Sequence, residues 1–272
     1  MKSLWVLNFI GAFLLTINLS CKKENNLPEV IVYGHAGTTL YAERWVYPAN
    51  TKESILYALD VLDADGVEVD VQMTKDSVLV LYHDAFLDDV TNLSGCICDY
   101  NFTDLTEVKV YQTKYKLVRL DGVINMCVER NKKIFLDLKP YNYCDSLNIN
   151  YSTFNNALNS IISLYSVTER SSITINTRNS DLLTVLSDTL IIKSFETENI
   201  DLGISNFQNN LTKELCINYT AMTVSSADAL KNLGIEFSLF GVKTTNEIKT
   251  AMTYLPSKII TDNIAYTKKI TQ

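Results

Sequence analysis

The sequence predicts an α/β protein, a distorted (β/α)8 TIM barrel, and three observations support this prediction. The chain has 272 residues, and a single α/β barrel uses about 250. From residue 30 onward, short β-branched runs alternate with amphipathic helical stretches, which is the pattern of parallel βαβ units. Ionisable side chains stand at the carboxyl ends of the early strands, where such a barrel carries its functional face.

Nine runs rich in β-branched or other apolar residues are predicted strands. They are Val30–Tyr33, Gly66–Gln72, Val78–Tyr82, Lys133–Leu138, Ser172–Asn176, Leu190–Phe195, Ala221–Ser225, Ile235–Gly241 and Lys258–Thr261. A barrel needs eight strands, so at least one of the nine is wrong or is an additional strand. The second and third runs are separated by only five residues, too few for a helical crossover, so they are not an ordinary βαβ pair.

Helical periodicity marks six segments between these strands. They are Lys52–Asp63, Asp121–Arg130, Tyr151–Tyr165, Ser180–Ser187, Ala227–Leu233 and Asn246–Leu255. Asn50 stands where the first helix would have its N-cap, and Glu53 stands where its capping-box partner would be. Asp84–Leu120 has no clear periodicity, so the sequence predicts an irregular insertion after the third strand, a length of chain that is more often functional than accidental.

Composition and charge exclude one class of partner. Hydrophobic residues make up 47% of the chain and charged residues 20%, which is typical of a globular domain. The formal net charge is −7 and the sequence pI is about 4.9, so nothing favours nucleic-acid binding. A phosphorylated ligand would need a local cation or one or two basic side chains to offset this overall charge.

The first 21 residues have the plan of a secretory signal. Lys2 gives a positive start, Leu4–Leu19 is mostly apolar, and the apolar stretch is short for a membrane span. Cys21 follows a small residue and resembles a bacterial lipoprotein cleavage box, although Asn18 stands where that box usually has leucine.

We therefore expect an exported lipoprotein that is anchored to the membrane through Cys21, on the periplasmic or cell-surface side. Residues 22–29 would be a tether and residues 30–272 the barrel domain. An ordinary signal peptide cut elsewhere and an uncleaved anchor are the alternatives. Without Cys21 the chain has five cysteines, an odd number, so one disulfide is compatible with the sequence but its pairing is open.

Polar side chains alternate with apolar ones on the early strands. His35 follows the first strand on the face of Tyr33, and His83 ends the third. Glu68 and Asp70 share one face of the second strand, opposite its valines, and Asp137 and Lys139 share a face of the fourth. Singly, such residues are more often structural, but their placement at the same strand ends predicts one shared site.

The residue types in this group indicate the chemistry. Glu68 and Asp70 can reach the same hard cation, and Asp137 can supply a third oxygen. Ligation by oxygen alone favours one divalent cation, Ca²⁺ or Mg²⁺, over Zn²⁺. The two histidines beside it are candidates for a general acid and base, and Lys139 for neutralising a phosphate oxygen.

These segments resemble the glycerophosphodiester phosphodiesterase family. Gly34-His35-Ala36-Gly37 and Tyr47-Pro48-Ala49-Asn50-Thr51 are similar to its opening His-Arg-Gly and Pro-Glu-Asn-Thr motifs, and the block Ala64–Asp76 to its most specific segment. Val80-Leu81-Tyr82-His83-Asp84 resembles its His-Asp motif, Leu136–Pro140 its Glu-x-Lys strand, and Ile259–Asn263 its last strand. The resemblance runs in order through about residues 30 to 265 and is strongest between 62 and 95.

The resemblance implies a distorted barrel with residues 85–120 as an inserted subdomain. It also implies metal-dependent hydrolysis of a small phosphodiester, a glycerophosphodiester, to glycerol phosphate and an alcohol. Glu68, Asp70 and Asp137 would hold the metal, His35 and His83 would be the acid/base pair, and Lys139 would touch phosphate.

Three positions and one segment depart from the family pattern. Ala36 replaces an arginine expected to hold phosphate, Ala49 replaces a glutamate, and Asp137 replaces a longer glutamate. The segment Phe240–Lys243 stands where the family often has Trp-Thr-Val-Asn. These changes concern the substrate more than the metal site, and we hypothesise that Arg44 or Lys139 takes over phosphate binding.

Two other functions remain open from the sequence. The departures favour a catalytically weakened barrel lipoprotein that binds a phosphorylated ligand, whereas both histidines and all three carboxyl positions favour the enzyme. A barrel glycosidase would use two carboxylates, and two histidines beside Glu68 and Asp70 do not suit it.

Overall fold

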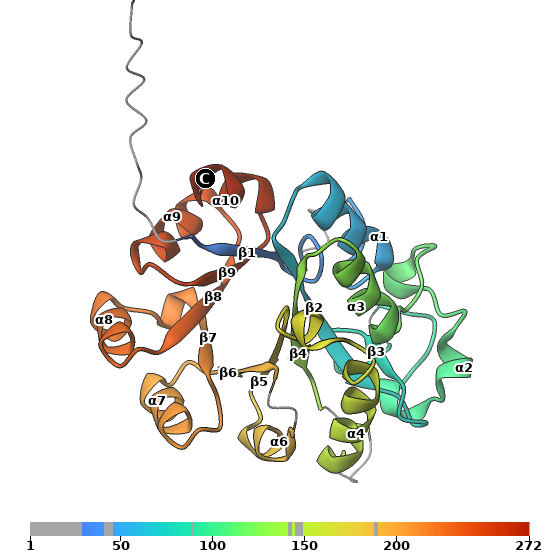
Figure 1. Ribbon diagram of the computed structural model, residues 1–272. Helices are drawn as coiled ribbons and strands as arrows, with labels where there is room; N and C mark the ends of the chain where they lie inside the picture. The colour runs from blue at the N-terminus through green and yellow to red at the C-terminus, as the bar shows by residue number, and fades with distance from the viewer. Residues whose placement is uncertain are drawn as a thin grey trace, which may run out of the picture.

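The computed structural model of the protein is a closed barrel of parallel strands ringed by helices (Figure 1). It describes residues 29–40, 46–88, 90–140, 143–144, 149–187 and 190–271. Eight strands close the barrel in the order β1-β9-β8-β7-β6-β5-β4-β2, with β2 pairing back onto β1. The predicted fold class is confirmed.

The strands agree with the predicted segments except at one place. Their bounds are β1 Ile31–Gly34, β2 Gly66–Met73, β3 Leu79–Leu81, β4 Lys133–Leu138, β5 Ile173–Thr177, β6 Ile192–Glu196, β7 Glu214–Asn218, β8 Glu236–Val242 and β9 Lys258–Thr261. The ninth candidate is explained by β3, which pairs antiparallel with β2 and lies outside the barrel.

The predicted strand Ala221–Ser225 is wrong. The strand lies earlier in the chain, at β7. Its Leu215 and Ile217 face the core outside the barrel, and Glu214 lies on the opposite face of the strand. This strand begins with a charged residue, Glu214, and has a short apolar run, Leu215–Ile217. The predicted segment instead contains Thr223, the N-cap of α8.

The α-helices of the described residues lie outside the barrel, and one of them, α2, belongs to the insertion after β3 (Figure 1). They are α1 Lys52–Leu56, which continues into a π-helical turn at Tyr57–Val61, α2 Phe102–Leu105, α3 Leu120–Glu129, α4 Tyr151–Ile162, α5 Val167–Arg170, α6 Ser180–Val185, α7 Ile200–Gln208, α8 Val224–Asn232, α9 Thr245–Thr253 and α10 Ile264–Thr271. The sequence did not predict α2, α5, α7 or α10. None of the helices in the described part of the chain has the length and apolar character to cross a membrane.

The predicted N-cap of the first helix is wrong by one residue. Thr51 is the cap, because its hydroxyl accepts a hydrogen bond from the backbone of Ser54. Asn50 has a left-handed backbone with φ of 57°, and its side-chain amide forms hydrogen bonds with Asp70 instead. Glu53 has no capping-box contact with Asn50, since the cap has moved.

The main core lies between the barrel and the surrounding helices. Val67, Val69 and Val71 face outward into it, as the alternation on β2 predicts, and each such burial contributes about 1.5–3 kcal/mol. Inside the barrel, Tyr33 and Phe135 pack edge to face, and the ion pair of Glu214 with Lys258 lies near the amino ends of the strands. The polar cavity is therefore left at the carboxyl ends.

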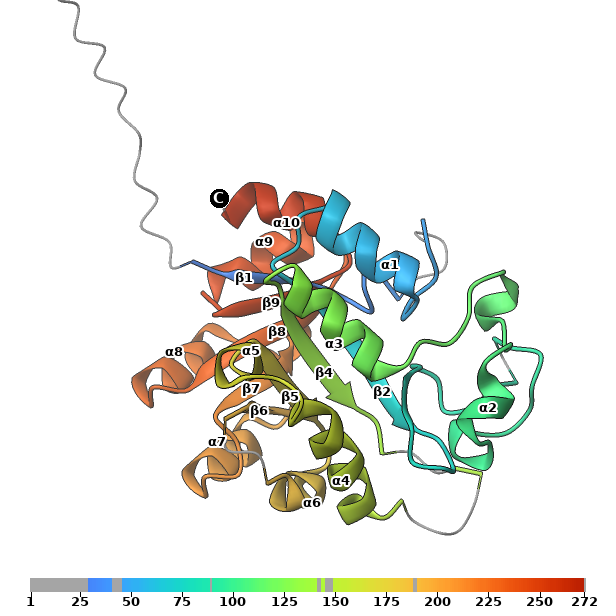
Figure 2. The ribbon, with the colours of Figure 1, turned by 45° about the vertical axis from the view of Figure 1, so that its right-hand side comes forward.

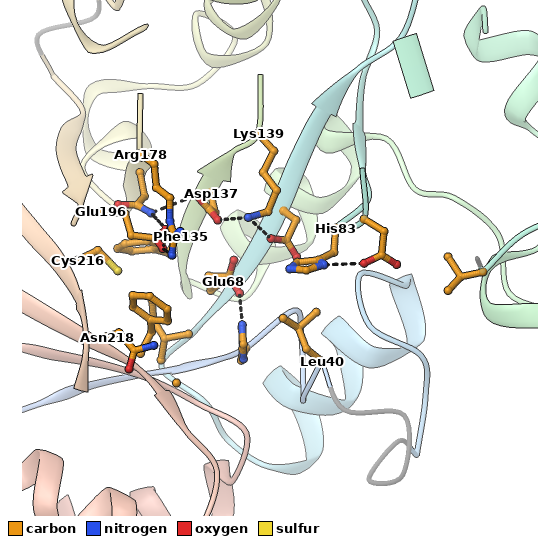
Figure 3. A pocket seen from close by; sticks show the side chains of 18 of the residues that line it. Leu40, Glu68, His83, Phe135, Asp137, Lys139, Arg178, Glu196, Cys216 and Asn218 are labelled. Carbon is orange, nitrogen blue, oxygen red and sulfur yellow. Dashed lines mark hydrogen bonds and ion pairs between the residues drawn. The ribbon is translucent and has the colours of Figure 1, made fainter. Parts of the chain in front are cut away.

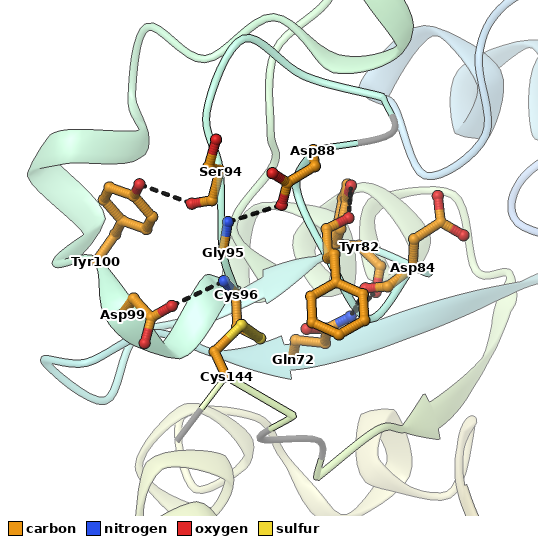
Figure 4. The surroundings of a disulfide bond; sticks show 11 residues. Gln72, Tyr82, Asp84, Asp88, Ser94, Gly95, Cys96, Asp99, Tyr100 and Cys144 are labelled. Atoms are coloured by element: carbon orange, nitrogen blue, oxygen red, sulfur yellow. Dashed lines mark hydrogen bonds between the residues drawn. A yellow bond between two sulfur atoms is a disulfide. The ribbon is translucent and has the colours of Figure 1, made fainter.

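Residues 82–119 form an insertion between β3 and α3 with a small core of its own. The buried members of that core are Val80 of β3 and, from the insertion, Tyr82, Leu87, Ile97, Leu105, Val108, Val110 and Leu117. In Figure 2 the insertion, with α2, lies beside the tips of β2 and β4. A disulfide between Cys96 and Cys144 joins it to the segment between β4 and α4, 48 residues away in sequence (Figure 4).

Candidate active site

A cavity of about 760 Å³ opens at the carboxyl ends of the barrel strands. Six predicted site residues line it together: His35, Glu68, Asp70, His83, Asp137 and Lys139. Six further polar residues, to which the sequence assigned no role, also line it: Asp84, Tyr111, Asn176, Arg178, Glu196 and Asn218. Arg44 and Cys21, the other two predicted site residues, lie outside the described residues.

Three carboxylates form the centre of this cavity. Oxygen atoms of Glu68, Asp70 and Asp137 lie within 4.8 Å of one another, and all three residues are buried. The register of β2 against β4 brings this about, because Asp70 pairs directly with Asp137. Three buried carboxylates are a donor set that fits a hard divalent cation such as Ca²⁺ or Mg²⁺.

Lys139 balances part of this negative charge. Its Nζ lies 2.6 Å from Asp137 Oδ2 and 3.2 Å from Asp70 Oδ1 (Figure 3). Burial and the charge of Asp70 raise the pKa of Glu68 well above its usual range. Burial acts in the same direction on Asp70, but the charge of Lys139, the two histidines and the hydrogen bond from Asn50 together outweigh it and lower the pKa of Asp70. One ammonium group leaves a net negative cluster, which favours binding of a cation.

The turn after β1 holds Glu68 through its backbone. The amide of Ala36 donates to Glu68 Oε2 at 2.9 Å. Ala36 and Gly37 have φ values of 49° and 92°, and a Cβ on Gly37 would come within 2.6 Å of Ser54 Oγ. Glycine is therefore needed at position 37 for the turn that aims this amide at the carboxylate.

Asn50 holds Asp70. Its Nδ2 donates to Asp70 Oδ2 at 2.7 Å, and its Oδ1 accepts from the Asp70 backbone amide at 3.0 Å. The left-handed conformation of Asn50, which asparagine tolerates better than most residues, turns its side chain toward β2. The residue predicted to cap a helix therefore positions a candidate metal ligand.

His35 is held from the barrel. Its Nδ1 lies 3.0 Å from Oδ1 of Asp262, whose side chain is fully buried at the end of β9. Its Nε2 lies 3.9 Å from Glu68 Oε2. Burial favours the neutral ring, but the hydrogen bond to Asp262 and the charge of Glu68 outweigh it and raise the pKa of His35 to about 9. Asp262 thus fixes which ring nitrogen faces the cavity.

His83 is held from the insertion. It follows β3, and its Nδ1 lies 2.9 Å from Asp84 Oδ1. Gln72 on β2 donates to the backbone carbonyls of Tyr82 at 2.9 Å and Asp84 at 2.8 Å, on either side of the histidine. Burial lowers the pKa of His83, but the hydrogen bond to Asp84 and the charge of Asp70 more than compensate and raise it.

A third group continues from Asp137 across β5 and β6. Asn176 Nδ2 donates to Asp137 Oδ1 at 3.1 Å and to Glu196 Oε2 at 3.2 Å. Arg178 Nε donates to Glu196 Oε1 at 2.6 Å. Burial and the charge of Asp137 raise the pKa of Glu196. The alternation rule that found the sites on β2 and β4 would also have found these residues on β5 and β6.

Comparison with known proteins decides the family. The sequence profile of the glycerophosphoryl diester phosphodiesterase family matches residues 45–266. The chain belongs to this family. The glycerophosphodiester phosphodiesterase of Bacillus altitudinis is 41% identical over 112 residues, which are 38% of this chain and 45% of that protein. Glycerophosphodiester phosphodiesterase 1 of Bos taurus is 30% identical over 125 residues, 42% of this chain and 38% of that protein. The matched part spans less than half the length of these curated relatives.

Solved structures share the fold over most of their length. A phosphodiesterase of Oleispira antarctica, in complex with the product sn-glycerol-3-phosphate, gives a TM-score of 0.74 at 18% identity and covers 89% of this chain and 96% of its own. The glycerophosphodiester phosphodiesterase of Thermotoga maritima gives 0.68 at 20% identity, with 89% and 98% covered. At these identities the similarity establishes the barrel fold and no more.

The two alanines that depart from the glycerophosphodiester phosphodiesterase motifs lie in adjoining backbone. The amide of Asn50 donates to the carbonyl of Ala36 at 2.9 Å, and both Ala36 and Ala49 are buried. Their side chains leave no unpaired charge, as expected if an arginine and a glutamate are missing together. The backbone of Ala36 still holds Glu68, so the missing arginine leaves the carboxylate cluster in place.

Proposed function

We propose that this protein hydrolyses glycerophosphodiesters to glycerol phosphate and an alcohol. The observation that carries the proposal is that two histidines and three buried carboxylates line one cavity at the carboxyl ends of the strands. The family, and the activity named for its relatives in Bacillus and cattle, support the same reaction.

His35 and His83 act as the acid/base pair in this proposal. Each imidazole is held at Nδ1 by a carboxylate, Asp262 or Asp84. One imidazole takes a proton from the water molecule that attacks the phosphorus, and the other gives a proton to the alcohol oxygen as its ester bond to phosphorus breaks.

Glu68, Asp70 and Asp137 would hold one divalent cation, Ca²⁺ or Mg²⁺, which is consistent with their charge and their oxygen donors. Such a cation supplies Lewis-acid polarisation of a phosphoryl oxygen. Lys139 contacts both Asp70 and Asp137, and we propose that its ammonium also touches the substrate phosphate, with Arg44 as a second candidate.

The test is to identify the products formed from glycerophosphocholine with Ca²⁺ or Mg²⁺ present. We expect glycerol 3-phosphate and choline in equal amounts, and no release after chelation. Phosphocholine and glycerol as products would show that the other ester bond is cut. Binding of glycerol 3-phosphate without release from any glycerophosphodiester would instead identify a binding protein.

His35→Gln and His83→Gln provide the controls for this test. Each should lower kcat by about 10²-fold or more, since general acid/base catalysis contributes about 10²–10⁴-fold. Both variants should keep the cation affinity of the parent protein, and His83→Gln, at the more exposed position, should also keep its melting temperature. Full activity in either variant would remove that histidine from the mechanism.

We also propose that the protein is exported and anchored in a membrane through a lipid on Cys21. The Cys96–Cys144 disulfide supports export, because disulfides persist in oxidising compartments. Labelling with a radioactive fatty acid in a bacterial host should mark the parent protein and not Cys21→Ser. Equal labelling of both, or recovery of the parent in the cytoplasm without label, would contradict the anchor.

A further inference from the structure

The cavity is rich in acidic groups although its proposed substrate is an anion. Among the residues that the structure describes, five carboxylates line it: Glu68, Asp70, Asp84, Asp137 and Glu196. Two permanently charged cations line it as well, Lys139 and Arg178. Lys139 sits between two carboxylates, so much of its charge is already balanced. Arg178 is also paired with a carboxylate, that of Glu196, but its side chain is 63% exposed, whereas that of Lys139 is 12% exposed.

Arg178 is placed by β5. Thr174, Asn176 and Arg178 alternate along one face, so the arginine follows the buried Asn176 at the end of the strand. Its Nε and Nη2 lie 2.6 and 2.5 Å from Glu196 Oε1. Figure 3 shows Arg178 and Glu196 on one side of Asp137, with His83 on the other.

This pair differs from a buried structural ion pair in one respect. The Arg178 side chain is 63% exposed, whereas that of Glu196 is only 9% exposed. Asn176 donates one hydrogen bond to Glu196 and another to Asp137, and so holds the Glu196 carboxylate in place. The carboxylate therefore acts as a fixed support, and the guanidinium that it holds extends into the open cavity. A guanidinium can hold a carboxylate on one edge and a phosphate on another.

We propose that Arg178 binds a non-bridging oxygen of the substrate phosphate and supplies the cationic contact that Ala36 cannot provide. This inference rests on the proposed phosphodiesterase function. It makes the triad Asn176, Glu196 and Arg178 a phosphate-holding arm that reaches the cavity from β5 and β6, opposite His83. Arg178 is then the substrate-contacting residue, and Asn176 and Glu196 are positioning residues.

The charge of the ligand provides a specific signature. Glycerol 3-phosphate carries more negative charge than a glycerophosphodiester, so loss of a phosphate-binding cation should weaken the product more than the substrate. For Arg178→Ala we expect the inhibition constant of glycerol 3-phosphate to rise about 10-fold or more. The KM for glycerophosphocholine should rise less, and kcat should change least. Arg178→Lys should recover part of the product affinity.

Two controls separate this role from a loss of structure. Arg119→Ala removes a comparable arginine, 49% exposed and paired with Asp121 outside the cavity, and should change neither constant. Arg178→Ala leaves Glu196 buried without its cation, so the double variant Arg178→Ala/Glu196→Gln is measured beside it. The double variant should show the same loss of product affinity.

Three results would overturn the inference. The first is an active parent enzyme in which Arg178→Ala leaves both constants unchanged. The second is recovery of product affinity in the double variant, which would mean that the unpaired Glu196 repels the ligand. The third is a loss confined to a substrate with a carboxylate in its alcohol, such as glycerophosphoserine, which would place Arg178 at the head group.

Failure of the proposed function has a different signature. If the parent hydrolyses no glycerophosphodiester, calorimetric titration with glycerol 3-phosphate in the presence of Ca²⁺ still measures phosphate binding. Weaker binding by Arg178→Ala than by the parent and by Arg119→Ala would then support phosphate binding by Arg178 in a protein that binds the ligand but does not hydrolyse it. Equal binding by all three, or no binding, would overturn it.

Discussion

The two sides of the cavity hold their histidines in different ways. On the barrel side, His35 is 14% exposed and bonds to Asp262, whose side chain is fully buried. On the insertion side, His83 is 38% exposed and bonds to Asp84, which is 34% exposed. The local pattern is the same, an imidazole held at Nδ1 by a carboxylate, but burial fixes one pair and not the other.

The difference shows where the insertion obtains its rigidity. The barrel side is fixed by strands whose register cannot slip without moving the whole core. The insertion side is held by separate tethers instead, namely the two hydrogen bonds of Gln72 and the Cys96–Cys144 disulfide. Removing the charge of the carboxylate beside His35 should therefore lower kcat greatly. Beside His83, removing a tether should lower kcat more than removing the charge of the carboxylate.

The largest effect is expected from the carboxylate on the barrel side. Asp262→Asn should lower kcat for glycerophosphocholine by about 10²-fold, because an amide at this buried position no longer holds the His35 ring in the tautomer that catalysis needs. Asp84→Asn is the matched variant on the exposed side and should lower kcat by less than about fivefold, since solvent screens that pair. Similar losses in both variants would remove the distinction between the two sides.

An intermediate effect is expected from the hydrogen-bond tether. Gln72→Met keeps the shape of the side chain but removes both bonds to the backbone around His83. We expect kcat to fall about 10-fold and the melting temperature to drop, because two backbone acceptors lose their donor. The cation affinity should stay unchanged, and a loss of cation binding would instead place the damage at the neighbouring Asp70.

The smallest effect on activity is expected from the covalent tether. Cys96→Ser/Cys144→Ser opens a loop of 48 residues, which should cost about 2–4 kcal/mol of stability and only a few-fold in kcat. Cys98→Ser leaves the disulfide intact and is the control. A loss of activity without a loss of stability would show that the tether positions His83 more tightly than we infer.

Strand alternation alone predicted the main groups of the site. Glu68, Asp70, Asp137 and Lys139 lie on two neighbouring strands, so their common face follows from the period of two. The fold class followed from the same regular alternation of strands and helices. What failed to appear from the sequence depends on contacts between distant segments.

Asn50 and Asp262 show why these contacts were missed. Asparagine before a helix fits the local pattern of an N-cap, and only the fold brings its amide to Asp70, twenty positions away. Asp262 and His35 are separated by 227 positions. Arg178 and Glu196 obey the same alternation at the ends of β5 and β6, so the sequence carries a signal for these two residues as well.

The most direct test of the account is a cation titration of chelator-treated protein, read both by calorimetry and by release of glycerol 3-phosphate from glycerophosphocholine. The parent should bind one Ca²⁺ or Mg²⁺, and its activity should return in step with that binding. Glu68→Gln should lose both together, whereas Glu53→Gln, outside the cavity, should lose neither. Full hydrolysis by the parent in excess chelator, with no cation bound, would contradict the account.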